Sequence, residues 1–105
     1  MAVTAKTLFR GAATTTTTTT LYTVPTTSIT TVVTNLVVTN TGGSAYTFTL
    51  TLDGTDMFTT AAIAANTTAF FDLKQVLAAN ATPKTIKGGA SNTAINFHIS
   101  GVEIA

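Results

Sequence analysis

The chain has 105 residues, a formal net charge of +1 and no cysteine, and only 9% of its residues are charged, against about 25% in a typical soluble domain. This length indicates one domain that is large enough to bury a core, and the lack of cysteine excludes a disulfide framework and thiolate metal sites. Because the five lysine and arginine residues are spread along the chain, and nucleic-acid binding needs a concentrated basic face, no nucleic-acid partner is expected.

The first 13 residues combine apolar and basic side chains, namely Val3, Leu8 and Phe9 with Lys6 and Arg10. They lack the apolar region of a secretory signal peptide, and no run in the chain approaches the roughly 18 apolar residues of a membrane span. We therefore expect a protein made in the cytoplasm, with no membrane partner. Three hypotheses stay open for residues 1–13: an arm whose five named side chains dock on a partner, a plain first strand, or a disordered end. Residues 14–105 are predicted to form a single domain.

Threonine dominates the composition, with 28 residues of this type, seven of them consecutive at residues 14–20. A threonine side chain is β-branched and stiff, so it suits a strand better than a helix. A flexible spacer would carry Gly, Pro or charge, and a glycosylated stalk would carry interspersed Pro. The composition therefore favours an all-β protein, with a strand over residues 18–24 and a loop or strand extension over residues 14–17.

Residues 29–40 ("ITTVVTNLVVTN") carry apolar side chains on both faces of the strand that they are predicted to form. The even positions Val32, Leu36 and Val38 are expected in the core. The odd positions Val33 and Val37 then point away from it, and a strand that is apolar on both faces is either central or covered by a partner. Val33 and Val37 are therefore candidate interface residues, together with those of the N-terminal segment.

Residues 45–52 ("AYTFTLTL") alternate strictly between apolar and threonine side chains, which predicts a strand with one buried face. Gly42 and Gly43 precede this strand and are expected to form a tight hairpin through positive φ angles. A second hairpin is predicted at Asp53 and Gly54, because Asp-Gly is a strong hairpin signal. It leads into expected strands over residues 57–63 and 69–73.

Residues 72–80 ("DLKQVLAAN") have apolar side chains at helical spacing, and we expect one helical turn there at most. A short strand is expected over residues 84–87, and a turn over residues 88–92. The last strand starts at Ile95. Its apolar positions change parity after Ser100, which predicts a β-bulge at Gly101.

About eight short strands separated by turn signals predict an all-β fold, an antiparallel β-sandwich of jelly-roll-like form. The order of the turns does not fix which strands pair. The expected core consists of the alternating apolar side chains Leu21, Val32, Leu36, Val38, Tyr46, Phe48, Leu50, Leu52, Ile63, Phe71, Leu77, Ile86, Ile95, Phe97 and Ile99.

No residue pattern indicates catalysis or metal binding. His98 is the single histidine and falls on the strand face opposite Phe97 and Ile99, without partners for a catalytic triad. Asp53 and Asp56 flank a turn glycine, but a calcium loop supplies more oxygen ligands in a defined order. We therefore expect no enzyme activity, no catalytic residue, no metal and no cofactor.

Four segments resemble a recurring class of small structural proteins of tailed bacteriophages. They are "LYTVP" at residues 21–25, "TTVVTNLVVTNT" at 30–41, "IAANTTAFFDLKQVL" at 63–77 and "INFHISGVEI" at 95–104. The resemblance covers residues 21–105 and rests on strand and turn patterns. It implies a β-sandwich component of the virion: a capsid decoration protein, a head fibre or a tail accessory.

The resemblance and the low-charge, threonine-rich surface together predict a capsid decoration protein that stabilises the assembled shell. Its expected partners are the major capsid protein and further copies of itself, in a homotrimer on the capsid surface. The alternative is a tail, baseplate or head-fibre component that recognises a carbohydrate on the host surface. Sugar binding normally uses exposed aromatic rings, and most aromatic residues here alternate as core residues.

Overall fold

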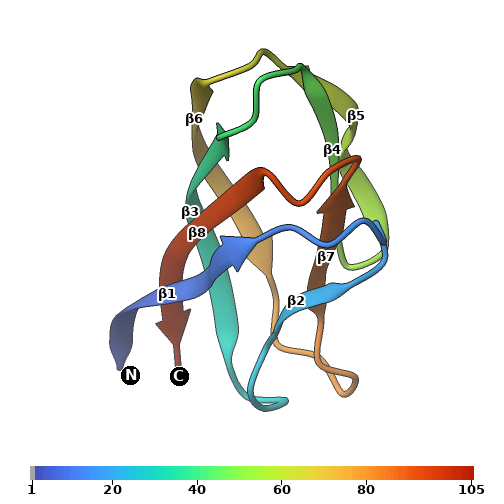
Figure 1. Cartoon of the computed structure of the whole chain (residues 1–105). Coiled ribbons are helices and arrows are strands. Elements are labelled where there is room, and N and C mark those ends of the chain that lie inside the picture. The colour runs from blue at the N-terminus through green and yellow to red at the C-terminus, as the bar shows by residue number, and fades with distance from the viewer. Residues whose placement is uncertain (1) are drawn as a thin grey trace.

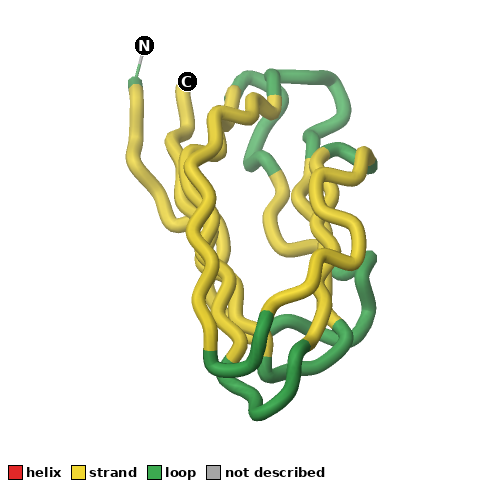
Figure 2. Tube along the Cα trace, turned by 90° about the horizontal axis from the view of Figure 1, so that it is seen from above, coloured by secondary structure: helices red, strands yellow, loops and turns green. Residues whose placement is uncertain are grey.

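The computed structural model describes residues 2–105, which form eight strands and no helix. The strands are β1 (Val3–Ala12), β2 (Thr20–Thr23), β3 (Thr30–Asn40), β4 (Tyr46–Leu52), β5 (Thr55–Ile63), β6 (Thr67–Leu77), β7 (Thr85–Ala90) and β8 (Ile95–Ile104). The first sheet has the order β1-β8-β3-β6 and the second sheet the order β2-β7-β4-β5. The two sheets form the two layers of a sandwich (Figures 1 and 2).

The pairing is nested around the middle of the chain. β4 pairs with β5, β3 with β6, β2 with β7 and β1 with β8, all antiparallel. Every connection except that between β4 and β5 passes from one sheet to the other. A long antiparallel pairing that wraps around two sheets in this way is the eight-stranded jelly roll, so the predicted fold class is confirmed.

The turn between β4 and β5 is the hairpin that the Asp-Gly pair predicts. Asp53 and Gly54 have φ angles of 53° and 78°, and a two-residue turn with both central residues at positive φ matches the twist of the strands that it joins. The carboxylate of Asp53 also lies 3.4 Å from the ammonium group of Lys84. This contact ties the hairpin to the segment before β7.

The predicted hairpin at Gly42 and Gly43 is wrong, because β3 and β4 belong to different sheets. Buried Asn40 makes the crossing: its side-chain amide donates to the carbonyls of Ser44 and Ile63, at 2.8 and 3.1 Å, and its Oδ1 accepts from the amide of Gly42. Gly42 has no positive φ angle. It is needed because a Cβ there would lie 2.7 Å from the ring of Tyr46.

Four phenylalanines form the centre of the core and join both sheets. The ring of Phe48 lies 5.3, 6.4 and 5.9 Å from the rings of Phe58, Phe71 and Phe97. Most predicted core residues are confirmed as buried: Leu36, Val38, Phe48, Leu50, Ile63, Leu77, Ile86, Ile95, Phe97 and Ile99. Four others are half-buried against this core, namely Leu21, Tyr46, Leu52 and Phe71.

Val32 is the predicted core residue that faces the wrong way, and a bulge in β3 is the reason. Thr34 is an extra residue between the paired positions Val33–Gly101 and Asn35–Ser100. The extra residue shifts the alternation by one. Val33 therefore faces the core, 1% exposed, and the expected orientations of the two neighbouring valines are reversed.

The bulge that the sequence places at Gly101 lies in the neighbouring strands instead. β8 keeps its alternation, since Ile99 and Gly101 are both buried. Opposite this point β3 has the extra residue Thr34 and β1 has the extra residue Leu8. A Cβ on Gly101 would lie 2.2 Å from the carbonyl oxygen of Val32, so the glycine permits a close approach of β3.

Two expected local structures are also corrected. Residues 72–80 form no helical turn, because β6 continues to Leu77, and Leu77 itself pairs with Thr31 of β3. Residues 88–92 are not simply a turn, because β7 continues to Ala90. In both segments the pairing with a neighbouring strand outweighs the local preference.

The threonine run divides into a loop and a strand. β2 starts at Thr20, later than predicted. The loop is held by side-chain hydrogen bonds among Thr14, Thr16 and Thr19, and the carbonyls of Thr14 and Thr19 accept from the amides of Ala90 and Gly88 in β7. The run is therefore neither a spacer nor a continuous strand, but a loop that closes back onto the sandwich.

Phe48→Ala is expected to lower the free energy of unfolding by about 3–5 kcal/mol, because it empties the centre of the aromatic cluster. Urea unfolding of dilute protein measures this change. Phe70→Ala is the matched control, because Phe70 is 74% exposed, and surface substitutions usually change stability by less than about 0.5 kcal/mol. Equal effects of the two substitutions would contradict the description of the core.

Gly89→Ala is expected to lower the melting temperature and the free energy of unfolding, the latter by about 1–3 kcal/mol. A Cβ at Gly89 would lie 2.3 Å from the carbonyl oxygen of Thr16, so the threonine loop must move. Gly43→Ala is the control, because nothing lies within 4 Å of a Cβ there. A neutral Gly89→Ala variant would show that the loop does not pack on β7.

Candidate functional site

Within residues 2–105, no three His, Asp or Glu side chains come together as a metal site. Asp53 pairs with Lys84, and Asp56 accepts a hydrogen bond from Thr59 at 2.8 Å. His98 accepts a hydrogen bond from Nε of Arg10 at 3.1 Å through its Nδ1. In the same residues, no helix is long and apolar enough to cross a membrane.

The notable surface feature is the outer face of the first sheet, the side turned away from the second sheet. The core-facing residues of β8 have odd numbers, so its even residues point outward, and the register extends this orientation to β1, β3 and β6. All three large exposed hydrophobic side chains lie on this face: Val3, Phe70 and Val76. Large exposed apolar patches on soluble proteins mark interaction sites.

The register arranges the outer face in transverse rows. One row is entirely apolar and consists of Ala5, Val102, Val32 and Val76; the next is polar and consists of Thr7, Ser100, Asn35 and Asp72; the third consists of Arg10, His98, Val37 and Phe70. Val3 and Ile104 extend the apolar row toward the termini. The face is therefore largely apolar, with Arg10 at the β1 edge and with Asp72 and Lys74 at the β6 edge.

The structure divides the predicted interface residues into three groups. Val3, Arg10 and Val37 lie on the outer face. Leu8 and Val33 are core residues, 7% and 1% exposed, so neither is free to contact a partner in this fold.

Lys6 and Phe9 form the third group. Lys6 points away from the outer face, and its ammonium group lies 3.3 Å from the carboxylate of Glu103. Phe9 is half-buried against the core. β1 is an edge strand of the first sheet. The docking-arm hypothesis for residues 1–13 stays a prediction. Met1, the first residue of that segment, lies outside the described residues.

Sequence reasoning missed Val32, Phe70, Val76, Val102 and Ile104 as surface residues. In residues 95–101 the odd-numbered residues, Ile99 and Gly101 among them, face inward. If this alternation continues without a bulge, the even-numbered Val102 and Ile104 face outward, so the sequence held a signal for these two residues. Val32 requires knowledge of the bulge at Thr34. The exposure of Phe70 and Val76 requires the knowledge that β6 lies at a sheet edge.

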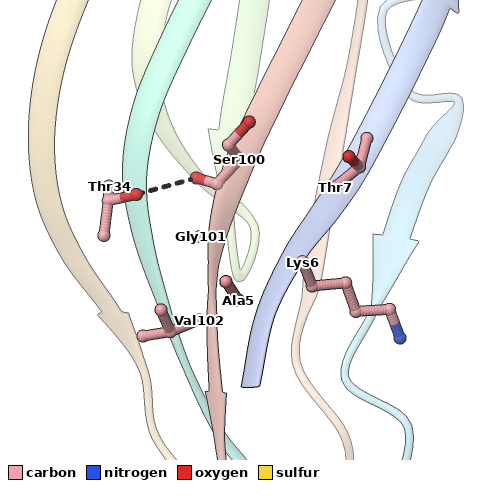
Figure 3. A pocket seen from close by; sticks show the side chains of 7 residues that line it. All are labelled: Ala5, Lys6, Thr7, Thr34, Ser100, Gly101 and Val102. Atoms are coloured by element: carbon pink, nitrogen blue, oxygen red, sulfur yellow. Dashed lines mark hydrogen bonds between the residues drawn. The ribbon is translucent and has the colours of Figure 1, made fainter. Parts of the chain in front are cut away.

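A shallow, open depression lies on the first sheet beside the bulges (Figure 3). It is lined by Ala5, Lys6, Thr7, Thr34, Ser100, Gly101 and Val102. Thr34 donates a hydrogen bond to the carbonyl of Ser100 at 3.3 Å across it. The lining has no carboxylate and no aromatic ring.

A buried polar cluster joins the two sheets near the chain termini. The hydroxyl of Tyr22 donates to the carboxylate of Glu103 at 2.5 Å and lies 2.7 Å from the hydroxyl of Thr31. Glu103 also pairs with Lys6. Burial, together with the hydrogen bond to Glu103, raises the pKa of Tyr22 to about 12.

Because the pKa of Tyr22 is higher in the folded chain than the usual value of about 10, its contribution to stability is complete below about pH 10 and is lost as the pH rises through about 12. Tyr22→Phe has no hydroxyl to ionise. We expect the difference in free energy of unfolding between the natural chain and Tyr22→Phe to shrink between pH 10 and pH 12, as measured by urea unfolding. A constant difference across this range would contradict the assigned pKa.

No protein-family model matches the chain, and no curated protein matches it. Solved structures do. A chain in the structure of infectious bursal disease virus, Gx strain, is similar over 97% of this chain and 30% of its own length, with 14% identity and a TM-score of 0.53. A chain of the T13 particle of the same virus has 16% identity over the same shares, with a TM-score of 0.47.

The C-terminal domain of EclA, named a sugar-binding protein, has 14% identity over 96% of this chain and 75% of that chain, with a TM-score of 0.39. The chain spans under a third of the length of the virus chains. At 14% identity the Gx-strain match shows a shared fold alone.

Proposed function

We propose that the chain is a structural protein of a virus particle, and specifically a decoration protein that binds the major capsid protein and stabilises the assembled shell of a tailed bacteriophage. The observation that carries the proposal is the eight-stranded jelly roll. Over 97% of this chain, the fold matches 30% of a chain in a virus structure. Jelly rolls also occur in lectins and cupins, and a fold does not fix a function. The surface must therefore supply the rest of the argument.

The surface supports a structural role better than a catalytic one. Only 9% of the residues are charged, and burial raises the pKa of Tyr22 to about 12, well above the neutral range in which a catalytic acid or base works. What the described residues do offer is the broad, largely apolar outer face. Burial of such a face against a partner stabilises an assembly, and we propose no enzymatic activity.

The carbohydrate-binding alternative has less support from the aromatic side chains. Of the eight aromatic residues, Phe70 alone is exposed, and its neighbours in the row are apolar Val37 and, beyond it, His98. A sugar site built on one ring would lack a second aromatic wall. Val37 beside Phe70 is apolar, whereas Thr68 and Asp72 along β6 are polar, so a sugar site is disfavoured by the single exposed ring alone.

Localisation on the virion tests the proposed function. Purified chain is added to shells assembled from the major capsid protein of the phage that encodes it, and the particles are imaged by cryo-electron microscopy. We expect density repeated over the whole shell and a higher temperature of shell disruption, because each bound copy buries area across neighbouring subunits. Density confined to the tail tip in complete virions would overturn the proposal in favour of the recognition role.

A further inference from the structure

The outer face of the first sheet carries charged side chains at both of its edges. Arg10 lies on β1, and Asp72 and Lys74 lie on β6, with the two central strands between them. All three side chains are exposed, and none forms an ion pair within residues 2–105. Arg10 is held over the face by its hydrogen bond to His98.

We propose that the outer face binds the outer face of a second copy of this chain, related by a two-fold axis that lies between the sheets and parallel to their strands. Such an axis places β1 of one copy on β6 of the other, and β8 on β3. Each transverse row then meets the same row in reverse order. A contact of this kind uses one patch twice, so the patch must be complementary to itself.

The rows satisfy this requirement. The apolar row meets itself, so Val76 lies on Ala5 of the second copy and Val32 on Val102. In the row with Arg10, the guanidinium group lies on the ring of Phe70 of the second copy, which is a favourable cation–π arrangement.

The polar row adds the charge pairing. Asp72 follows Phe70 by two residues on the same face of β6, one row away. The guanidinium group of Arg10 therefore approaches the carboxylate of Asp72 of the second copy as well. Each pair of copies makes this contact twice.

A two-fold axis perpendicular to the strands that passes through the row of Asp72 is disfavoured by the same residues. It would place each strand on the same strand of the second copy, running in the opposite direction, with the row of Asp72 on the axis. The two Asp72 carboxylates would then face each other, which is destabilising. Arg10 would lie on Ala5 and lose its partners.

The area of the face is sufficient for a specific contact. Four strands at about 4.8 Å spacing and about 33 Å length give on the order of 600 Å² for each copy, or about 1,200 Å² in total. That value lies at the lower end of specific protein–protein interfaces. Aligned sheets pack at about −30°, so the twist of the first sheet does not prevent the contact.

The proposal concerns a second copy and stands independently of capsid binding. A two-fold contact closes on a pair of copies, in place of the three-fold arrangement expected from the sequence. Self-association is measured in solution without any capsid. Its failure would leave capsid decoration open, and failure of decoration would leave the pair of copies intact.

Sedimentation velocity over a concentration range from 1 µM to 1 mM, roughly the range of weak pairs, tests the proposal. We expect a concentration-dependent shift from one copy to two. Val76→Lys is expected to weaken this association at least about tenfold without loss of the folded state, because Val76 is 59% exposed. Asp56→Arg is the control for a charge change on the second sheet and should leave the association unchanged.

Charge reversal tests the orientation of the axis. Arg10→Asp and Asp72→Arg should each weaken self-association, because each creates a like-charge contact. An equimolar mixture of the two variants should associate at least about as tightly as the natural chain, since both contacts between unlike variants then join opposite charges. The double variant Arg10→Asp/Asp72→Arg should likewise recover association.

Three results would overturn the proposal. The first is a single copy at all concentrations up to 1 mM, which would assign the face to a different protein. The second is association that Val76→Lys leaves unchanged, which would place the contact elsewhere. The third is the absence of any gain on mixing the charge variants, which would exclude the proposed axis.

Discussion

The extra residue at Thr34 in β3 determines which side of the first sheet each valine faces. Without it, Val32 would continue the buried alternation of Leu36 and Val38, and Val33 would be at the surface. With it, Val33 packs in the core and Val32 joins the apolar row of the outer face. One inserted residue thus supplies both a buried side chain and a surface side chain, and the core and the candidate interface depend on the same bulge.

The bulge in β3 is possible because the strands beside it adapt at the same level. β1 has its own extra residue, Leu8, whose side chain is buried next to Gly101. Gly101 has no side chain to separate β8 from the carbonyl of Val32. Bulges bend the strands and increase their twist, and the open depression beside these bulges is lined by Thr34, Ser100 and Gly101 among others (Figure 3).

The same use of glycine recurs in the second sheet. Gly88 and Gly89 of β7 lie against the backbone of Leu50 and Thr16, where any side chain would collide. The threonine loop therefore rests on the sheet edge and covers it with hydroxyl groups. A hydroxyl-rich surface that also carries Asp56 and Lys87 on the second sheet, and a largely apolar surface on the first, give the two sides of the sandwich different chemistry.

Sequence alone determined the all-β class, the Asp53–Gly54 hairpin and ten of the buried core residues, because these depend on alternation and turn chemistry within a few neighbouring residues. Only the tertiary structure decided the crossing at Asn40, the continuation of β6 to Leu77 and the orientation of Val32. Each of these depends on hydrogen bonds to strands that are distant in the chain, and a bulge is visible only against its partner strand. The outer face is therefore a property of pairing: its four strands come from both ends and the middle of the chain, and no local pattern records that Arg10, His98, Val37 and Phe70 share one row.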